Sequence, residues 1–344
     1  MATRRRRNLH DRVTLSDVAA AAGVSAITVS RALRDPDKVS PVLREAILST
    51  IEQMGYVPHF AARALASHSS GVIAVLVPAL SNYVFLSAMR GIEDRARAAD
   101  LRIQYANTHF DPAEEIRQIR LFLGQNPAGI ILVGVADDDT VRALLARAPC
   151  PVVQMMDISA PPVSLGIGID NRAAAAVATH HLLQRGYRRI ALLGGQGDLR
   201  SARRLAGYRD VLAPAGLYDE SLVLRAPAHT SISLGCQLLD LLKKAAPDAD
   251  AAFCQSDDIA LGVLFECQRR GIRVPEDFGI CGFNDLDCAR SAFPAITTIR
   301  LPRYEIGYRA VDMIVRASAE GLEQPALVDL GFQLIERQSS ARAG

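Results

Sequence analysis

The sequence predicts a small all-α domain followed by a large α/β core made of two doubly wound parallel-sheet subdomains. Two observations predict this division. Apolar residues recur at helical spacing within the first sixty residues, and from residue 71 nearly continuous apolar runs alternate with amphipathic helical stretches. The 344 residues allow two or three domains, at roughly 100–200 residues for each domain.

The first helix is predicted to begin after Thr14, because Thr14 followed three residues later by Asp17 is a capping pattern. Gly23 is expected to end it, since glycine enters the left-handed conformation without a Cβ penalty. The apolar face at positions i, i+3, i+4 and i+7 consists of Leu15, Val18, Ala19 and Ala22.

Two more short helices complete a predicted helix-turn-helix domain. Ser25 is expected to cap the second helix, and Ser40 precedes the third, which has Pro41 in its first turn and Gly55 beyond its end. The residues predicted to face inward from the turn and these two helices are Val24, Val29, Leu33, Leu43, Ile47 and Ile51.

The outer face of the second helix carries side chains suited to a DNA groove. Serine, threonine and arginine bond phosphates or base edges, and alanine and isoleucine contact a thymine methyl group. An ordinary protein-binding helical bundle is the alternative that the helix pattern leaves open. The residues expected on this face are Ala26, Ile27, Thr28, Ser30 and Arg31.

Charge is distributed unevenly along the chain. Residues 1–69 hold 10 Lys/Arg and 6 Asp/Glu, a net charge of +4, whereas the remaining residues hold 29 and 31, a net charge of −2. The run Arg4–Arg7 is either a solvated tail or a segment that contacts phosphates without sequence preference. The N-terminal part alone is therefore suited to a polyanion.

The large domain is predicted to hold its ligand between two subdomains, at the carboxyl ends of the strands. Candidate contacts there are Asp157, Arg204, Ser256 and Asp257, because such groups bond sugar hydroxyls or pair with a carboxylate. The alternative for Ser256 or Asp257 is a helix N-cap. The predicted strands are 71–77, 102–107, 128–135, 151–157, 189–195, 251–255 and 278–284.

The motifs VTLSDVAAAAGVSAITVSRAL, VSPVLREAILSTIEQMGYVP and HFAARALA together resemble the LacI–GalR class of bacterial transcription regulators, and the similarity continues through most of the chain. The resemblance implies a periplasmic-binding-protein-like core and a head that binds double-stranded operator DNA. It places Ala26 and Ile27 where the operator bases are chosen. The DNA-binding residues expected in the head are Thr14, Ser25, Ala26, Ile27, Thr28, Ser30 and Arg31.

Residues 59–66, between Pro58 and a polar segment, are predicted to form an isolated short helix. Such a helix is only marginally stable in water unless another surface packs against it. By resemblance this hinge helix pairs with its dimer mate in the minor groove, with Ala62 and Leu65 at the DNA and Leu65 wedged between central base pairs. Packing of Leu65 on the next domain is the alternative. His59, also expected at the DNA, stands where the family usually has Asn, which puts capping of the hinge in doubt.

By residue-matching to the family, the cleft is lined by Phe85, Asp157, Arg204, Ser256 and Asn284. Ser256 stands where Asn is frequent and Asn284 where Asp is frequent. Loss of an acidic group beside Arg204 suits an anionic effector. The segments PVVQMMD, FECQRRGIRVPEDFGICGFNDLD and DLGFQL resemble the gluconate-utilisation repressors within the class, so the expected effector is a sugar acid, gluconate or a relative.

The expected domains are a basic tail (1–12), a helix-turn-helix domain (13–58), a hinge and linker (59–70) and an effector-binding and dimerisation domain (71–344), with crossovers near 157–172 and 284–303. A homodimer on a pseudo-palindromic operator is expected, because one such head makes few contacts; a tetramer is left open. The alternative function is a sugar-acid sensor whose N-terminal domain contacts protein.

Other classes of protein are disfavoured. No apolar run approaches the ~20 residues of a membrane span and no signal peptide is evident, so a cytoplasmic location is expected. The six cysteines form no CxxC pair, GGQGDLR at 194–200 lacks a phosphate-loop register, and the adjacent His180 and His181 are poorly spaced for one metal. We therefore expect no catalytic residues, metal or cofactor, and no enzyme.

Overall fold

The computed structural model describes residues 13–57, 69–134, 138–158, 162–195, 199–227, 229–321 and 326–342. The chain divides into two compact units, Met1–Ser70 and Gly71–Gly344. The tail Arg4–Arg7 and the hinge residues His59, Ala62 and Leu65 lie outside the described residues, so the expectations for them remain predictions.

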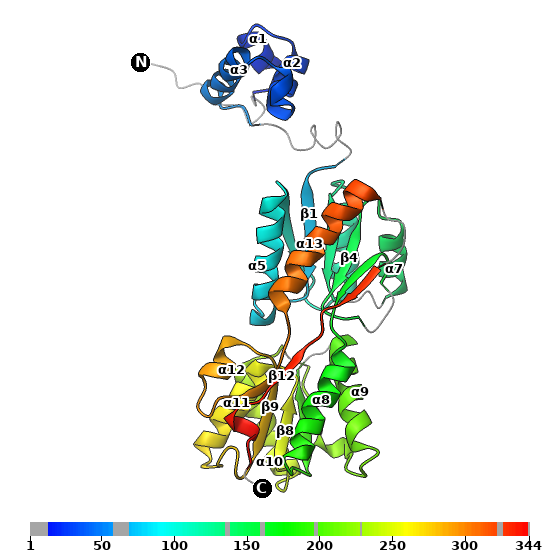
Figure 1. Cartoon of the computed structure of the whole chain (residues 1–344), viewed down its shortest axis with the longest axis vertical. Helices are drawn as coiled ribbons and strands as arrows, with labels where there is room; N and C mark the ends of the chain where they lie inside the picture. The colour runs from blue at the N-terminus through cyan, green and yellow to red at the C-terminus, as the bar shows by residue number, and fades with distance from the viewer. Residues whose placement is uncertain are drawn as a thin grey trace, which may run out of the picture. The chain divides into compact units, whose positions relative to one another are not determined.

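The described residues of the first unit form a helix-turn-helix domain with three short helices: α1 (Leu15–Ala21), α2 (Ala26–Arg34) and α3 (Pro41–Met54), with a 3-10 turn, η1 (Pro36–Lys38), before α3 (Figure 1). The predicted capping box is confirmed: the Asp17 N–H donates to Thr14 Oγ1 at 3.3 Å, and the Thr14 N–H donates to Asp17 Oδ2 at 2.8 Å. Ser25 caps α2, whereas Ser40 makes no side-chain capping bond. The turn glycines Gly23 and Gly55 have φ of 65° and 62°.

The core of this unit differs from the prediction at one position. The prediction for Leu33 is wrong, because Leu33 is 37% exposed while Ala32 is buried. Both lie on the same side of α2 as Val29, at i+3 and i+4, and periodicity alone does not choose between them. The buried residues are Val18, Ala19, Val29, Ala32 and Ile47.

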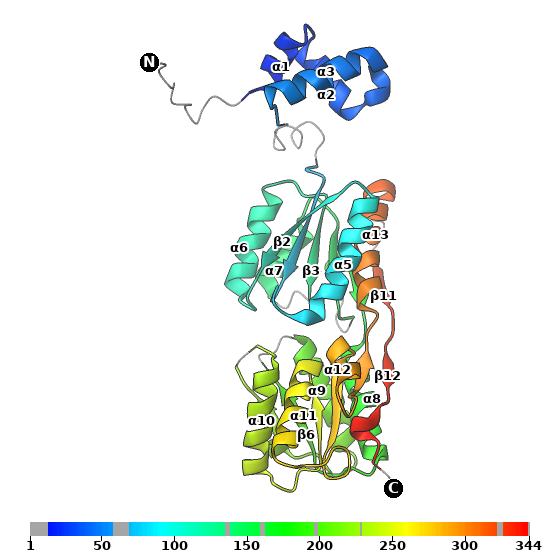
Figure 2. The ribbon, with the colours of Figure 1, turned by 90° about the vertical axis from the view of Figure 1, so that its left-hand side faces the viewer.

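The second unit contains two six-stranded sheets, each with helices on both faces (Figures 1 and 2). The first sheet, with its helices called lobe 1, has the order β11-β5-β4-β3-β1-β2, and all of its pairs are parallel. Its strands are β1 (Val72–Val77), β2 (Arg102–Asn107), β3 (Gly129–Val133), β4 (Val152–Met155), β5 (Leu165–Gly168) and β11 (Ala326–Asp329). Helices α5 (Tyr83–Ala98) and α13 (Arg303–Glu320) cover one face, and α6 (Pro112–Leu123) and α7 (Asp139–Ala146) the other.

The second sheet, with its helices called lobe 2, has the order β12-β10-β9-β8-β6-β7, and only the β10–β12 pair is antiparallel. Its strands are β6 (Ile190–Gly194), β7 (Val223–Arg225), β8 (Ala251–Cys254), β9 (Gly279–Asn284), β10 (Thr297–Arg300) and β12 (Gln333–Ile335). Helices α8 (Asn171–Gln184) and α9 (Leu199–Leu212) cover one face, and α10 (Ile232–Ala245) and α11 (Asp257–Arg269) the other. The short elements are α12 (Asp287–Ser291), η2 (Glu220–Leu222) and η3 (Gln338–Ser340).

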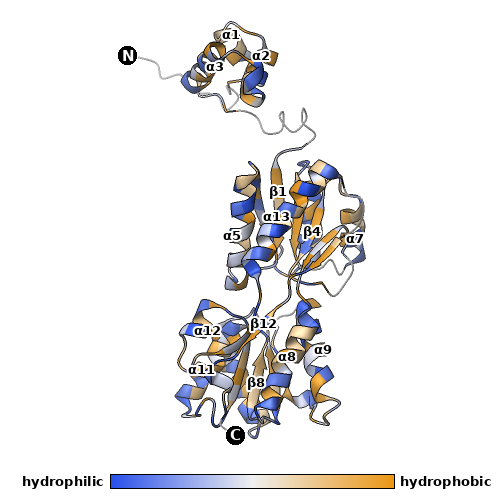
Figure 3. Ribbon diagram, viewed as in Figure 1, coloured by the Kyte–Doolittle hydropathy of each residue, from blue (hydrophilic) through white to orange (hydrophobic). Residues whose placement is uncertain are grey.

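The central strands of both sheets are almost wholly buried and apolar, which explains why sequence periodicity located them (Figure 3). Five described strands escaped prediction: β5, β7, β10, β11 and β12. They are three or four residues long, and each contains glycine, threonine, glutamine or a charged residue beside its apolar residues.

The chain passes from lobe 1 to lobe 2 between β5 and α8, and back to lobe 1 between β10 and α13. These crossings lie within the two ranges, 157–172 and 284–303, where crossovers were expected. A third crossing, from β11 to β12, was not predicted. Figure 2 shows these two strands following one another along one side of the unit. Residues 284–303 and the C-terminal segment therefore both tie lobe 2 to lobe 1.

Candidate functional site

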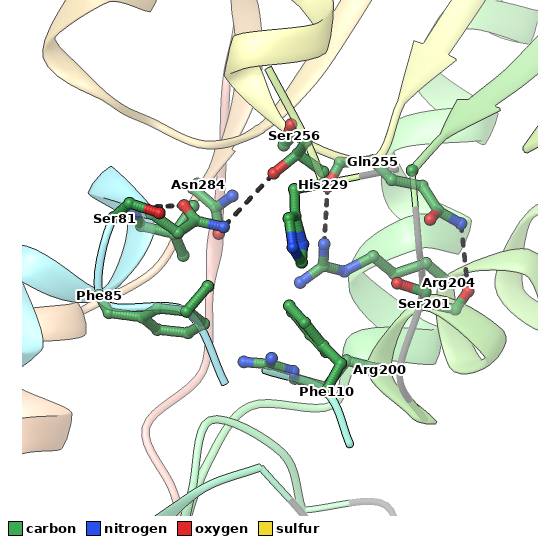
Figure 4. A pocket seen from close by; sticks show the side chains of 15 residues that line it. Ser81, Phe85, Phe110, Arg200, Ser201, Arg204, His229, Gln255, Ser256 and Asn284 are labelled. Carbon is green, nitrogen blue, oxygen red and sulfur yellow. Dashed lines mark hydrogen bonds between the residues drawn. The ribbon is translucent and has the colours of Figure 1, made fainter. Parts of the chain in front are cut away.

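A cavity of about 100 Å³ lies between the lobes, at the carboxyl ends of strands from both sheets (Figure 4). In parallel α/β sheets this edge is where loops bring polar groups together. Lobe 1 supplies residues from the β1–α5 turn and the segment after β2, and lobe 2 supplies residues after β6, β7, β8 and β9. The lining is Ala79, Ser81, Asn82, Val84, Phe85, Phe110, Gly195, Arg200, Ser201, Arg204, His229, Thr230, Gln255, Ser256 and Asn284.

Arg204 on α9 is held rigidly at the cavity. Its Nε donates to Asn171 Oδ1 at 3.0 Å and its Nη1 donates to the Gln255 carbonyl at 2.7 Å. The guanidinium carbon lies 3.8 Å from the centre of the Phe283 ring, in cation–π contact. These contacts preorganise a positive charge.

Arg200, one turn earlier on α9, adds a second positive charge and packs against lobe 1, with its guanidinium carbon 5.4 Å from the centre of the Phe85 ring. None of the described lining residues is Asp or Glu. Burial weakens water's screening, so both arginines favour an anion in this cavity.

Asn284 contributes a hydrogen-bond acceptor that lacks a donor. Asn284 is 2% exposed, and its Oδ1 makes no hydrogen bond with any described group. A buried unsatisfied acceptor is costly, so a ligand hydroxyl that donates to it would be favoured. Figure 4 places Asn284 across the cavity from the arginines.

Two further contacts join the lobes beside the cavity. The Asn82 side-chain amide of lobe 1 donates to Thr230 Oγ1 of lobe 2 at 3.3 Å. The rings of Phe110 and His229 lie 5.6 Å apart between their centres. A change in the angle between the lobes must alter both contacts.

The structure brings four of the six predicted effector residues to the cavity: Phe85, Arg204, Ser256 and Asn284. Ser256 has both anticipated roles, because it lines the cavity and also caps α11, accepting from the Ile259 N–H at 3.4 Å.

Asp157 does not line the cavity, in contrast to the expectation. It is 2% exposed and its Oδ2 accepts from Asn171 Nδ2 at 2.7 Å. The chain turns at Met156, with φ of 82°, and this directs Asp157 toward the start of α8. Asp157 therefore supports Arg204 through Asn171.

Asp257 also lies outside the lining, fully buried beneath β9 and β10. Its oxygens accept from the Leu286 N–H and the Thr298 hydroxyl, both at 2.6 Å. Gly282 leaves room for it, since a Cβ there would lie 2.2 Å from Asp257 Oδ1. Burial raises the pKa of Asp257 to about 7, although both hydrogen bonds oppose the rise.

Sequence reasoning missed several lining residues. All follow the carboxyl ends of strands, so the parallel topology was the signal that could have found them. His229 and Thr230 follow β7, which was itself not predicted. The missed polar and aromatic residues are Ser81, Asn82, Phe110, Arg200, Ser201, His229, Thr230 and Gln255.

The outer face of α2 is the candidate nucleic-acid interface. Ile27 is 65% exposed although it is apolar, and Arg31 is exposed on the same helix. Ala26 is half-buried against the domain core, so only part of it is available. Ser25 Oγ and Thr28 Oγ1 bond one another at 2.9 Å at the start of the helix.

The structure contains a serine–histidine contact that the sequence did not reveal. His181 Nε2 lies 2.8 Å from Ser340 Oγ, and Glu336 Oε1 lies 3.9 Å from His181 Nδ1. Burial lowers the pKa of His181, and Ser340 is 1% exposed. Ser340 also bonds Thr297 Oγ1 at 2.6 Å. The group anchors the C-terminal segment to lobe 2, and a substrate has no access to Ser340.

Within the described ranges, no three His, Cys, Asp or Glu side chains gather as metal ligands. In the same part of the chain, no helix has both the length and the apolar composition that crossing a bilayer requires.

Comparison with known proteins gives consistent results for both units. Residues 14–59 match the model for bacterial regulatory proteins of the lacI family, and residues 179–340 match the periplasmic binding protein-like domain. The chain is 37% identical over 329 residues to the HTH-type transcriptional regulator GntR of Pseudomonas aeruginosa, with 96% of each chain covered.

Two solved structures are also similar. A LacI-family transcriptional regulator from Silicibacter pomeroyi superposes with a TM-score of 0.89 at 30% identity, covering 96% of this chain and 100% of that chain. The transcription regulator GntR of Chromobacterium violaceum gives a TM-score of 0.74 at 38% identity, covering 78% of this chain and 99% of that chain.

Proposed function

Because the chain belongs to the LacI family of bacterial regulatory proteins and is a DNA-binding transcriptional regulator, we propose that it is a homodimeric repressor released from a two-fold symmetric operator by a sugar acid. The exposed face of α2 would lie in the major groove, with Ile27 and Arg31 toward the bases. Two heads related by two-fold symmetry supply the contacts that one head lacks.

The single observation that carries the effector proposal is the charge of the cavity. Arg200 and Arg204 lie at one end, and no described lining residue is acidic. The effector's carboxylate would pair with this end, while a hydroxyl would donate to Asn284 Oδ1 at the other. A compact polyhydroxy monocarboxylate such as gluconate has both groups, and the sequence segments that resemble gluconate-utilisation repressors support the same choice.

The release mechanism follows from the position of the cavity. A ligand that binds both lobes favours one angle between them, and the head directly precedes the first lobe in the chain. Moving the first lobes of a dimer would separate the paired hinges and weaken operator binding. Coupling of this kind is reciprocal, so operator DNA should weaken effector binding by the same factor.

Isothermal titration of the full chain against gluconate, 2-ketogluconate, 6-phosphogluconate and glucose tests the effector. We expect an acid to bind and glucose to bind much more weakly. Binding of glucose alone would contradict the proposal. A gel-shift titration on the DNA upstream of the protein's own gene, with and without the bound acid, tests the release. Tighter operator binding with the acid would show a corepressor instead.

A further inference from the structure

The backbone between β9 and α12 adopts an unusual conformation beside the cavity. Asn284 has φ of 109° and Asp285 has φ of 52°, and neither is glycine. Non-glycine residues keep positive φ where the surroundings determine it. Since the Asn284 side chain lines the cavity, the groups that hold residue 285 also set the direction of the cavity's hydroxyl acceptor.

Asp285 is held by arginines from two different segments. Its Oδ2 accepts from Arg300 Nε at 2.7 Å and its Oδ1 accepts from Arg337 Nη2 at 2.6 Å. The carboxylate side chain is only 9% exposed. Burial raises the pKa of Asp285, but the bonds from Arg337 and Arg300 outweigh it and keep the pKa below its ordinary value. The group is therefore charged at neutral pH.

These two arginines lie next to two crossings between the lobes. Arg300 ends β10, just before the crossing that leads to α13. Arg337 follows β12 in the C-terminal segment, after the crossing from β11. One carboxylate thus joins the cavity wall at Asn284 to both segments that return the chain from one lobe to the other.

A third arginine extends the connection into lobe 1. Arg303, the first residue of α13, donates from Nη2 to the Asp285 carbonyl and from Nη1 to the Val84 carbonyl, each at 3.3 Å. Val84 lies in the first turn of α5, beside Phe85 of the cavity. The backbone of residue 285 is therefore two hydrogen bonds away from the cavity wall of the opposite lobe.

We propose that Asp285 is a positioning residue that couples occupancy of Asn284 to the angle between the lobes. A ligand that hydrogen-bonds to Asn284 moves the backbone at 285 or holds it in place. The three arginines transmit this change in the backbone to the crossings and to α5. Neutralising Asp285 would leave Arg300 and Arg337 without their counter-charge, so the backbone at 285, whose carbonyl accepts from Arg303, would be held less firmly and the link to lobe 1 would loosen while Asn284 still bonds the ligand. This inference rests on the proposed function only for the identity of the ligand.

The test compares Asp285→Asn with wild type in the full chain. Asp287→Asn is the matched control, because Asp287 lies two residues away, loses the same charge and bonds only the exposed Arg290 among described side chains. Gluconate affinity is measured with and without operator DNA, and the ratio gives the coupling factor, typically about 5- to 150-fold. We expect Asp285→Asn to bind gluconate within about threefold of wild type with a coupling factor near 1. The control, Asp287→Asn, should keep the coupling factor of the wild type.

A second readout needs no ligand. Hydrogen exchange is followed at residues 83–86 of lobe 1 and 300–306 at the crossing. Asp285→Asn should speed exchange about tenfold in both segments, because a less firmly held backbone at 285 weakens the hydrogen bond from Arg303 to the carbonyl of that residue. If wild type does not bind gluconate, the effector proposal fails, and this exchange measurement alone decides the role of Asp285.

Two results would overturn the inference: a wild-type coupling factor in Asp285→Asn, or faster exchange confined to lobe 2. A fall in both affinities with an unchanged coupling factor would mean that Asp285 only stabilises the lobe. Should Asp285→Asn fail to fold, Arg337→Gln removes one donor while Arg300 still pairs with the carboxylate. It should lower the coupling factor partway, and an unchanged factor would count against the inference.

Discussion

At the scale of single residues, the two cavity arginines of α9 have different surroundings. Arg204 is bonded to Asn171 and the Gln255 carbonyl and stacks on Phe283, so its replacement would disturb lobe 2 as well as a ligand. Arg200 packs across the cleft on Phe85. Arg200 is therefore the better probe of charge recognition.

We expect Arg200→Gln to weaken gluconate binding roughly ten- to a hundredfold, because a charge-assisted hydrogen bond contributes about 1.5–3 kcal/mol. Weak binding of a neutral sugar should be unaffected. Isothermal titration measures both. Arg209→Gln is the control, since Arg209 is an exposed residue of the same helix that bonds Tyr218. Equal losses in the two variants would argue against an anion at Arg200.

Asp257 gives stability an unusual dependence on pH. Its pKa is about 7 in the folded protein and 3.8 as a free group, so the folded state retains a proton that the unfolded state has lost. The resulting stabilisation is complete below pH 4 and is lost as pH rises through about 7. Asn at this position accepts from Leu286 and donates to Thr298 without titrating.

The prediction is that the free energy of unfolding of wild type, measured relative to Asp257→Asn, falls between about pH 4 and pH 7. Urea denaturation across that range measures it. The contribution of His181, whose pKa is lowered by burial, runs the opposite way and cancels in the difference. A difference that is flat with pH would show that Asp257 is ionised throughout.

At the scale of elements, paired helices cross at glycines. A Cβ on Gly235 of α10 would lie 2.2 Å from the Ile259 carbonyl oxygen of α11, and one on Gly307 of α13 would lie 2.0 Å from the Ala88 carbonyl oxygen of α5. Gly207 of α9 meets α8 similarly, with 2.0 Å to the Arg172 carbonyl oxygen. These obstacles are backbone atoms, which cannot rotate away.

Gly235→Ala should therefore destabilise the effector-binding unit by about 1–3 kcal/mol or more, as overpacking does. Gly124→Ala is the matched control, because its nearest neighbours would be 3.5 Å away at ordinary contact distance. Thermal unfolding of the two variants measures the difference. Equal midpoints would mean that the α10–α11 crossing shifts without cost.

At the scale of the whole molecule, the two units have separate cores. The buried residues of the helix-turn-helix domain form one cluster among themselves, and the four remaining clusters contain only residues from beyond position 71. A unit with its own core folds independently. Ligand recognition should therefore persist without the head.

We expect a fragment of residues 71–344 to be folded and to bind the sugar acid with the affinity that the full chain has without DNA. It should have no measurable operator binding. Circular dichroism, isothermal titration and gel shift measure the three properties. A fragment that still binds the operator would place DNA recognition outside the head, and one that folds but loses the ligand would show that the head contributes to the cavity.

The sequence by itself determined the features that depend on neighbouring residues. Capping at Thr14 and Ser25, the turn at Gly23 and the buried central strands follow from local hydrogen bonds, backbone freedom and apolar runs. The short edge strands could not be found, because their stability comes from pairing partners distant in sequence.

Only the tertiary structure decided which of the residues at strand ends line the cavity. Asp157 and Asp257 follow β4 and β8 as closely as Asn284 ends β9, yet both are turned into the protein, where Asn171, Leu286 and Thr298 supply donors. The third crossing and the arginines around Asp285 likewise join residues far apart in sequence: Arg337 and Asp285 are 52 positions apart, and Arg303 and Val84 are 219. Burial and hydrogen bonding between distant segments are set when the chain folds into its two sheets and their crossings, and no local pattern encodes them.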